Sequence, residues 1–186
     1  MVDNLGFAMF TASVNARDCL VGQAYSAPDY TLATAANVFS FAGASLFVAG
    51  STTPVIGNMK FGIKSSSSLT VDRYFTGANG RKAEPLNAGW VEPVVTVDQE
   101  YADQITWVAR NFTDESFSAQ MDFVGKAIDG TSSETLSILC PAVKINGENP
   151  TVDGPDVLQH TLELPVLDNG TNPPMTLRYI SRDTVA

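Results

Sequence analysis

The sequence is poor in the side chains that most often carry chemistry. It contains one histidine, His160, and two cysteines, Cys19 and Cys140, which lie 121 positions apart. A disulfide framework needs more cysteines, and a zinc site needs Cys or His ligands at close spacing. We therefore predict no metal or cofactor site, and we expect both thiols to be buried as small apolar side chains.

Positive charge is also scarce. The chain has 11 Lys and Arg against 20 Asp and Glu, a net charge of −9. Residues 1–90 hold six basic and five acidic residues, whereas residues 91–186 hold five and fifteen. Tight binding of duplex phosphate needs clustered cations, and the only adjacent pair is Arg81 and Lys82. Sequence-specific nucleic-acid binding is therefore not expected.

Long hydrophobic runs are missing. The longest apolar stretch, residues 39–49, is interrupted by Ser and Gly and is far shorter than the roughly 20 residues that span a bilayer. No positively charged segment precedes a hydrophobic one near Met1, so no secretory signal is visible and cytoplasmic synthesis is expected. With 44% hydrophobic residues in 186, the chain can bury a substantial core in a single domain.

Enzyme motifs are absent as well. Neither GxxxxGK[ST] nor GxGxxG occurs. A histidine-based catalyst would have to use His160, but Leu158 and Leu162 are its neighbours on the same strand face, which favours a structural or interfacial histidine. The acidic residues of the loop 146–156 do not match the twelve-residue calcium loop. We predict that no residue is catalytic and that the chain is not an enzyme.

The first 70 residues are rich in small side chains. Gly, Ala, Ser and Thr crowd residues 24–50, and four consecutive serines occupy 65–68. Such residues bury little area, so we expect loops or long arms that become ordered against another surface. Residues 45–49 and 58–63 are strand candidates within this region.

From residue 69 onward, apolar and polar residues alternate in short segments separated by Gly, Asn, Asp and Pro turns, which is typical of β-strands. Pro93 near the start of one segment favours an edge strand or a bulge there. Residues 136–145 are apolar on both faces, as expected of a central covered strand. The predicted strands are 69–75, 91–97, 117–128, 136–145, 157–166 and 175–182.

One helix is predicted near residues 101–112. Its apolar side chains recur at the 3.6-residue period, and this stripe must pack against a sheet because no other helix is available to cover it. The stripe comprises Tyr101, Ile105, Val108, Ala109 and Phe112.

Successive strands without alternating helices imply antiparallel pairing. We therefore predict a mainly β fold: an antiparallel β-sandwich or small β-barrel with one flanking α-helix and long loops or arms. Residues 1–55 are expected to form a loop-rich N-terminal arm and hairpin region packed on the same domain, and residues 56–186 the sandwich or barrel.

The order of segments over residues 56–183 resembles that of the major tail tube proteins of long-tailed, siphophage-type bacteriophages. The resemblance rests on the order of short motifs with one helix between strands, and it covers about two-thirds of the chain. These motifs are Ile56-Gly57-Asn58-Met59-Lys60-Phe61, Leu69-Thr70-Val71-Asp72, Tyr74-Phe75-Thr76-Gly77, Arg81-Lys82-Ala83-Glu84-Pro85, Gly89-Trp90, Val94-Val95-Thr96-Val97, Phe117-Ser118-Ala119-Gln120-Met121 and Leu139-Cys140-Pro141-Ala142-Val143-Lys144-Ile145-Asn146.

The resemblance implies a structural virion protein of the phage tail, made in the host cytoplasm, with no catalytic residue. It implies self-assembly into stacked hexameric rings that form a hollow tube for genome ejection. The implied partners are further copies of the chain, the tape measure protein, the tail tip and terminator proteins, and passing double-stranded DNA without specific binding; no membrane is implied. Arms and hairpins that link subunits and rings are expected within residues 24–68.

Two other functions are kept as alternatives. One is another virion β-sandwich module, such as a head decoration or a fibre-associated protein. The other, less favoured, is an enzyme that uses His160.

Overall fold

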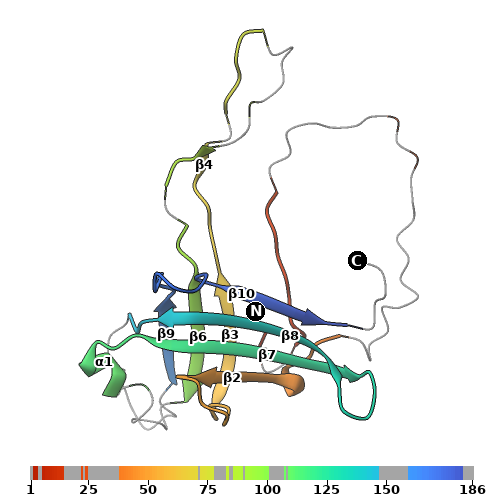
Figure 1. Ribbon diagram of the computed structural model, residues 1–186, viewed down its shortest axis with the longest axis vertical. Helices are drawn as coiled ribbons and strands as arrows, with labels where there is room; N and C mark the ends of the chain where they lie inside the picture. The colour runs from red at the N-terminus through yellow and green to blue at the C-terminus, as the bar shows by residue number, and fades with distance from the viewer. Residues whose placement is uncertain are drawn as a thin grey trace.

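The computed structural model confirms a mainly β fold, with two antiparallel four-stranded sheets packed as a sandwich and one short helix (Figure 1). It describes residues 2–3, 6–14, 22, 24, 38–70, 72–77, 83, 86–89, 91–100, 107, 109–146 and 159–181. The alternation of apolar and polar residues in the sequence therefore predicted the fold class correctly.

The first sheet has the strand order β1-β3-β6-β9. Its strands are β1 (Val2–Asp3), β3 (Asn58–Lys64), β6 (Val94–Glu100) and β9 (Gln159–Pro165). The predicted strands 58–63 and 157–166 are thus confirmed. The prediction of an edge strand at 91–97 is wrong, because β6 pairs with β3 on one side and β9 on the other. Pro93 precedes the first residue of β6, so it removes no donor from the central ladder.

The second sheet has the order β10-β8-β7-β2. Its strands are β2 (Ala44–Val48), β7 (Phe117–Ala127), β8 (Ser133–Val143) and β10 (Thr176–Ile180). The central position predicted for the segment 136–145 is confirmed, because β8 lies between β10 and β7. A short 3-10 helix, η2 (Phe41–Gly43), leads into β2.

The core lies between the two sheets and follows the period of two. In β6 and β7 every second side chain is buried, and the polar residues between them face outward. Aromatic rings link the layers, with Phe61 of β3 5.7 Å from Phe123 of β7. The buried cluster is Leu46, Val48, Phe61, Val95, Val97, Trp107, Phe117, Ala119, Met121, Phe123, Cys140, Val143, Leu162 and Leu164.

One row of the first sheet's inner face is polar. Asn58 pairs in register with Gln99, and Gln99 with His160, across β3, β6 and β9. Gln99 is buried, and it alternates with the buried Val95 and Val97 along β6. The apolar core therefore ends in a row of two amides and an imidazole.

The two sheets are joined along one margin. Isolated bridges connect Val143 with Val166 and Asn146 with Glu163, so the end of β8 continues into the neighbourhood of β9. Strand β10 pairs farther along the same side of β8, opposite β7, and β8 is its one strand partner within the described residues. The sandwich is thus closed where β8 meets β9 and open beyond β10.

The helical region differs from the prediction. The helix α1 spans Ala109–Thr113, while residues 101–106 and 108 lie outside the described residues. The predicted stripe is wrong for its two described members, because Ala109 is exposed and Phe112 is 75% exposed. Trp107 is buried instead, with its ring 6.2 Å from that of Phe117. The large buried side chain thus precedes α1, and within α1 Arg110 and Asn111 are half-buried while Ala109, Phe112 and Thr113 are exposed.

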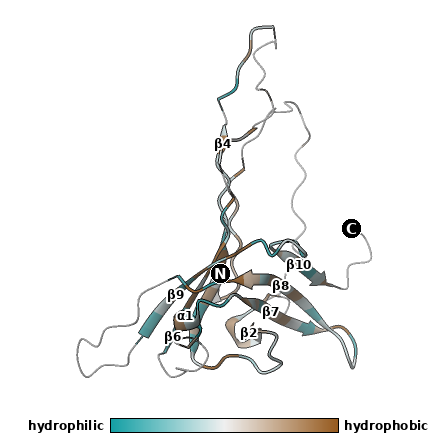
Figure 2. Cartoon of the chain, turned by 60° about the vertical axis from the view of Figure 1, so that its left-hand side comes forward, coloured by the Kyte–Doolittle hydropathy of each residue, from teal (hydrophilic) through white to brown (hydrophobic). Residues whose placement is uncertain are grey.

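A long hairpin projects from the sandwich between β3 and β6. Beyond Lys64 and Val94 it continues through the two-residue strands β4 (Leu69–Thr70) and β5 (Leu86–Asn87), which pair with each other. Both views show this ribbon standing away from the two sheets (Figures 1 and 2). This projecting hairpin lies mostly after the stretch 24–68; the expectation of subunit-linking arms within 24–68 stays a prediction, because residues 25–37 lie outside the described residues.

Candidate assembly surfaces

Of the one histidine and two cysteines in the chain, the structure describes His160 and Cys140, and these lie in separate parts of the fold. His160 is half-buried on β9 opposite Gln99, and Cys140 is fully buried on β8. Burial raises the pKa of the Cys140 thiol to about 11, so it stays protonated and unreactive at neutral pH. This confirms Cys140 as a buried apolar residue; Cys19 lies outside the described residues.

The described acidic residues lie on different elements. Asp98 faces outward from β6, and Asp114 at the end of α1 forms an ion pair with Lys144, with Oδ1 2.7 Å from Nζ. Residues 147–158 and the pair Arg81–Lys82 lie outside the described residues. Within the described ranges, no three His, Cys, Asp or Glu side chains are grouped closely enough to hold a metal ion. None of the described helices is both long and apolar enough to cross a bilayer.

A hollow of about 600 Å³ opens beside the loop that follows β2. Its described lining is mostly small or apolar and includes one acid and one base, Glu100 and Arg110. The hydroxyl of Ser51 donates to the carbonyl of Thr53 and accepts from its N–H, so it stabilises the loop's own turn. The Arg110 guanidinium lies 5.0 Å from the centre of the Phe117 ring, as in a cation–π contact. These interactions serve the packing of the loop and α1.

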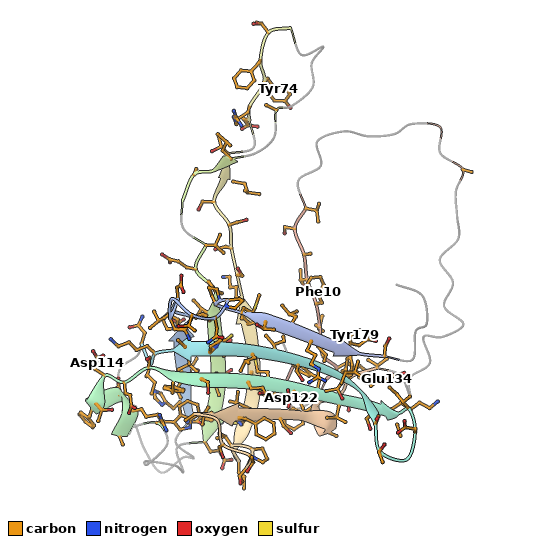
Figure 3. All side chains as sticks on the ribbon, in the orientation of Figure 1. Phe10, Tyr74, Asp114, Asp122, Glu134 and Tyr179 are labelled. Atoms are coloured by element: carbon orange, nitrogen blue, oxygen red, sulfur yellow. The ribbon has the colours of Figure 1, made fainter. Side chains whose placement is uncertain are left out.

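The projecting hairpin exposes several large apolar side chains. Tyr74 and Phe75 near its tip are each more than half exposed, and Leu69 and Leu86 on the ladder are exposed as well. Figure 3 shows Tyr74 far above the sandwich. The ribbon is pinned by the N–H of Ala83 donating to the carbonyl of Arg73 at 2.8 Å, and by the Arg73 guanidinium 5.3 Å from the Phe75 ring centre. Tyr74, Phe75 and Leu86 nevertheless keep more than half of their surface exposed.

The inner side of β10 is a second uncovered apolar surface. Leu177 and Tyr179 pair with Ile138 and Leu136 of β8, and these in turn pair with the buried Met121 and Phe123 of β7. Leu177 and Tyr179 therefore point to the core side of the sheet, yet each is 59% exposed. The alternation that we read as one core face in 175–182 is present, but the opposite sheet does not extend far enough to bury it.

The N-terminal segment supplies a third exposed apolar surface. Residues 9–14 are exposed and extended, with Phe10 93% and Val14 84% exposed (Figure 3). The segment starts from the sandwich, because the N–H of Ala8 donates to the carbonyl of Phe39 at 2.8 Å and Phe7 bridges to Ser40. Sequence reasoning treated this region as an undivided arm. The alternation Phe10, Ala12, Val14 against Thr11 and Ser13 was the signal that could have identified a strand.

The three surfaces share one property. Each presents apolar side chains that no second layer of the described structure buries. A scan against known protein families finds no matching family model, and a search of curated proteins finds no match. The fold and these surfaces are therefore the basis on which a function has to be argued.

Proposed function

We propose that this chain is a structural virion protein, the subunit of a phage tail tube, which assembles into stacked rings around a channel for DNA. The work is mechanical: free energy comes from burying surface between copies. The partners proposed with it are further copies, the tape measure protein, and the tail tip and terminator proteins.

The projecting hairpin is the observation that carries the proposal. A two-stranded ribbon is at best marginally stable in water without a third strand or another layer. This one has two-residue ladders and exposes Tyr74, Phe75, Leu69 and Leu86. Burying one such side chain stabilises a contact by about 1.5–3 kcal/mol. A neighbouring copy of the same chain is the partner that a self-assembling tube subunit always has available.

Charge supports the same function. The outer face of the first sheet presents Asp98 of β6 and Glu163 of β9, and it also presents Lys60 and Lys64 of β3, which pair with Asp98 and Val94. The charge of this face is therefore mixed, whereas the whole chain carries −9. A net negative subunit repeated around a channel repels phosphate and lets duplex DNA pass without adhering.

The proposal is tested by imaging and sedimentation of the purified full chain. We expect rings and tubes in negative-stain electron microscopy. The double substitution Tyr74→Ser with Phe75→Ser removes two apolar anchors, so it should raise the protein concentration at which tubes form at least about tenfold. Val124→Ser, which removes one exposed apolar side chain from the outer face of β7, is the matched control and should leave that concentration unchanged.

Two results would contradict the proposal. One is a chain that stays monomeric at high concentration and also when mixed with tail-initiating proteins. The other is a set of finite oligomers that never polymerise, which would favour a head decoration or fibre-associated module.

A further inference from the structure

The four sheet margins differ in how they are protected. The β9 margin is bridged to β8, β1 is two residues long, and the β2 margin is partly occupied because the N–H of Val55 donates to the carbonyl of Leu46 at 2.8 Å. Strand β10 runs for five residues and has no strand on its outer side among the described residues. It is the long open edge of the described sandwich.

This edge lacks the usual defences against pairing. Native edge strands are blunted by proline, by several charges or by inward-pointing charge. Strand β10 contains no proline, and its one charge, Arg178, lies on the opposite face from the exposed Leu177 and Tyr179. The rings of Tyr179 and Phe39 meet edge to face at 6.4 Å, so the apolar surface continues from β10 onto the residue that holds Ala8. The edge is thus suited to accept an extended apolar strand.

The same chain contains a strand-like segment that pairs with no strand of the described structure. Residues 10–14 are extended and alternate Phe10, Ala12 and Val14 with Thr11 and Ser13, the period of a strand with one apolar face. Within the described residues, none of the five makes a backbone–backbone hydrogen bond. The segment carries no charge, as suits an apolar edge. In Figure 1 it runs from the sandwich past β10 and away from it.

We propose that residues 10–14 of one copy add as a strand to the β10 edge of a second copy. Phe10, Ala12 and Val14 then cover Leu177 and Tyr179, and backbone groups of both strands gain partners. A second copy is required because, within one chain, Phe10 and Tyr179 both remain exposed. The inference rests on the proposed self-assembly and names one of its contacts.

Donor and acceptor are different parts of the chain, so the contact is heterologous. Every copy can give one strand and receive one, and such contacts generate closed rings or continuing rows. This is the geometry that repeated assembly needs.

Cross-linking between two variants tests the contact directly. Thr11 and Thr176 lie on the polar faces of their strands, and cross-strand Cβ atoms are about 4.5–5.5 Å apart, within reach of a disulfide. Full-length chains with Thr11→Cys or Ser13→Cys are mixed with chains carrying Thr176→Cys, all with Cys19→Ser, under assembling conditions. We expect a disulfide-linked species of twice the chain mass from one of the mixtures. Chains with Val124→Cys in place of Thr176→Cys are the matched control and should give none.

A second measurement separates this contact from assembly in general. Phe10→Ser with Val14→Ser should raise the concentration needed for assembly at least about tenfold, while the unfolding midpoint of the monomer stays unchanged because both side chains are exposed. Assembly with no mixed disulfide, and no effect of this double substitution, would overturn the contact and leave the proposed function standing. An intrachain disulfide in a monomeric chain that bears both cysteines would also overturn it. Wild-type chains that neither assemble nor cross-link would overturn both.

Discussion

The chain segments that form β3 and β6 in the sandwich continue into the projecting hairpin, and the two regions differ in how much their side chains are buried. Inside the sandwich they carry Phe61, Val95 and Val97, all buried against the second sheet. Beyond Lys64 and Val94 the same pair of chain segments continues as the hairpin, where Leu69 and Leu86 are exposed. The apolar character of the side chains is similar, so burial is decided by whether a second layer lies opposite. The sandwich supplies a second layer for these side chains, whereas the described residues of the hairpin do not.

The sharpest way to break this comparison is to remove the same side chain from each region. Leu164→Ala in β9 deletes a fully buried side chain and should lower the free energy of unfolding by about 2–5 kcal/mol. Leu86→Ala in the hairpin removes the same atoms from an exposed site and should change it by less than about 0.5 kcal/mol. Urea unfolding of the two variants under non-assembling conditions measures both values. Equal losses would show that the hairpin folds as part of the core.

A glycine substitution tests how tightly the sandwich is packed. A Cβ on Gly43 would overlap the backbone carbonyl oxygen of Val124, so Gly43→Ala forces the start of β2 away from β7. We expect a loss of about 1–3 kcal/mol in unfolding free energy. Gly130→Ala in the β7–β8 turn meets nothing within 4 Å and is the matched control, with an effect near zero. A neutral Gly43→Ala would mean that the two strands have room to separate.

The smallest effect concerns the buried thiol. The pKa of Cys140 rises from 9.0 to about 11 on folding, so the native state holds this proton more tightly than the unfolded state. Stability from this residue is therefore full below pH 9 and falls as the pH rises from 9 towards 11. Unfolding free energies at pH 8 and pH 10.5 should show a decline that is smaller in Cys140→Ala.

A cysteine placed in the hairpin provides the contrast. With Cys19→Ser as background, Ser66→Cys should be alkylated by iodoacetamide at pH 8 at least about tenfold faster than Cys140. Similar rates would show that β8 opens readily and that the two regions are protected to the same degree.

The sequence predicted the parts of this fold that are governed by the period of two. Met121 and Phe123 on β7, and Leu162 and Leu164 on β9, are buried as the alternation indicated, because both strands face another sheet. Tyr179 alternates just as regularly and is exposed, because alternation marks a face and cannot say how far the opposite layer extends. For the same reason the segment 10–14 was missed, and of the strand predicted at 69–75 the structure has β4 at Leu69–Thr70.

The helix shows a different limit. A stripe ending in Phe112 was expected to pack on a sheet, but Phe112 is exposed and Trp107 is buried. The helix α1 is five residues long, too short to present the predicted stripe, and the buried Trp107 lies before its first residue. His160 and Cys140 occupy separate strands, β9 and β8, as the predicted strands 157–166 and 136–145 indicated. The resemblance to tail tube proteins stays a prediction for the imaging experiment.

The polar row of Asn58, Gln99 and His160 has a consequence for the hairpin. A ladder made only of aliphatic pairs can slide by two residues and still bury the same face, because side chains repeat every second position. Sliding β6 by two against β9 would set the buried amide of Gln99 beside Leu162 instead of the imidazole, which penalises the slipped alignment. The row fixes the register at the end of β3 and β6 that lies opposite the hairpin. With the register fixed, the hairpin extends equally far from the sandwich in every copy.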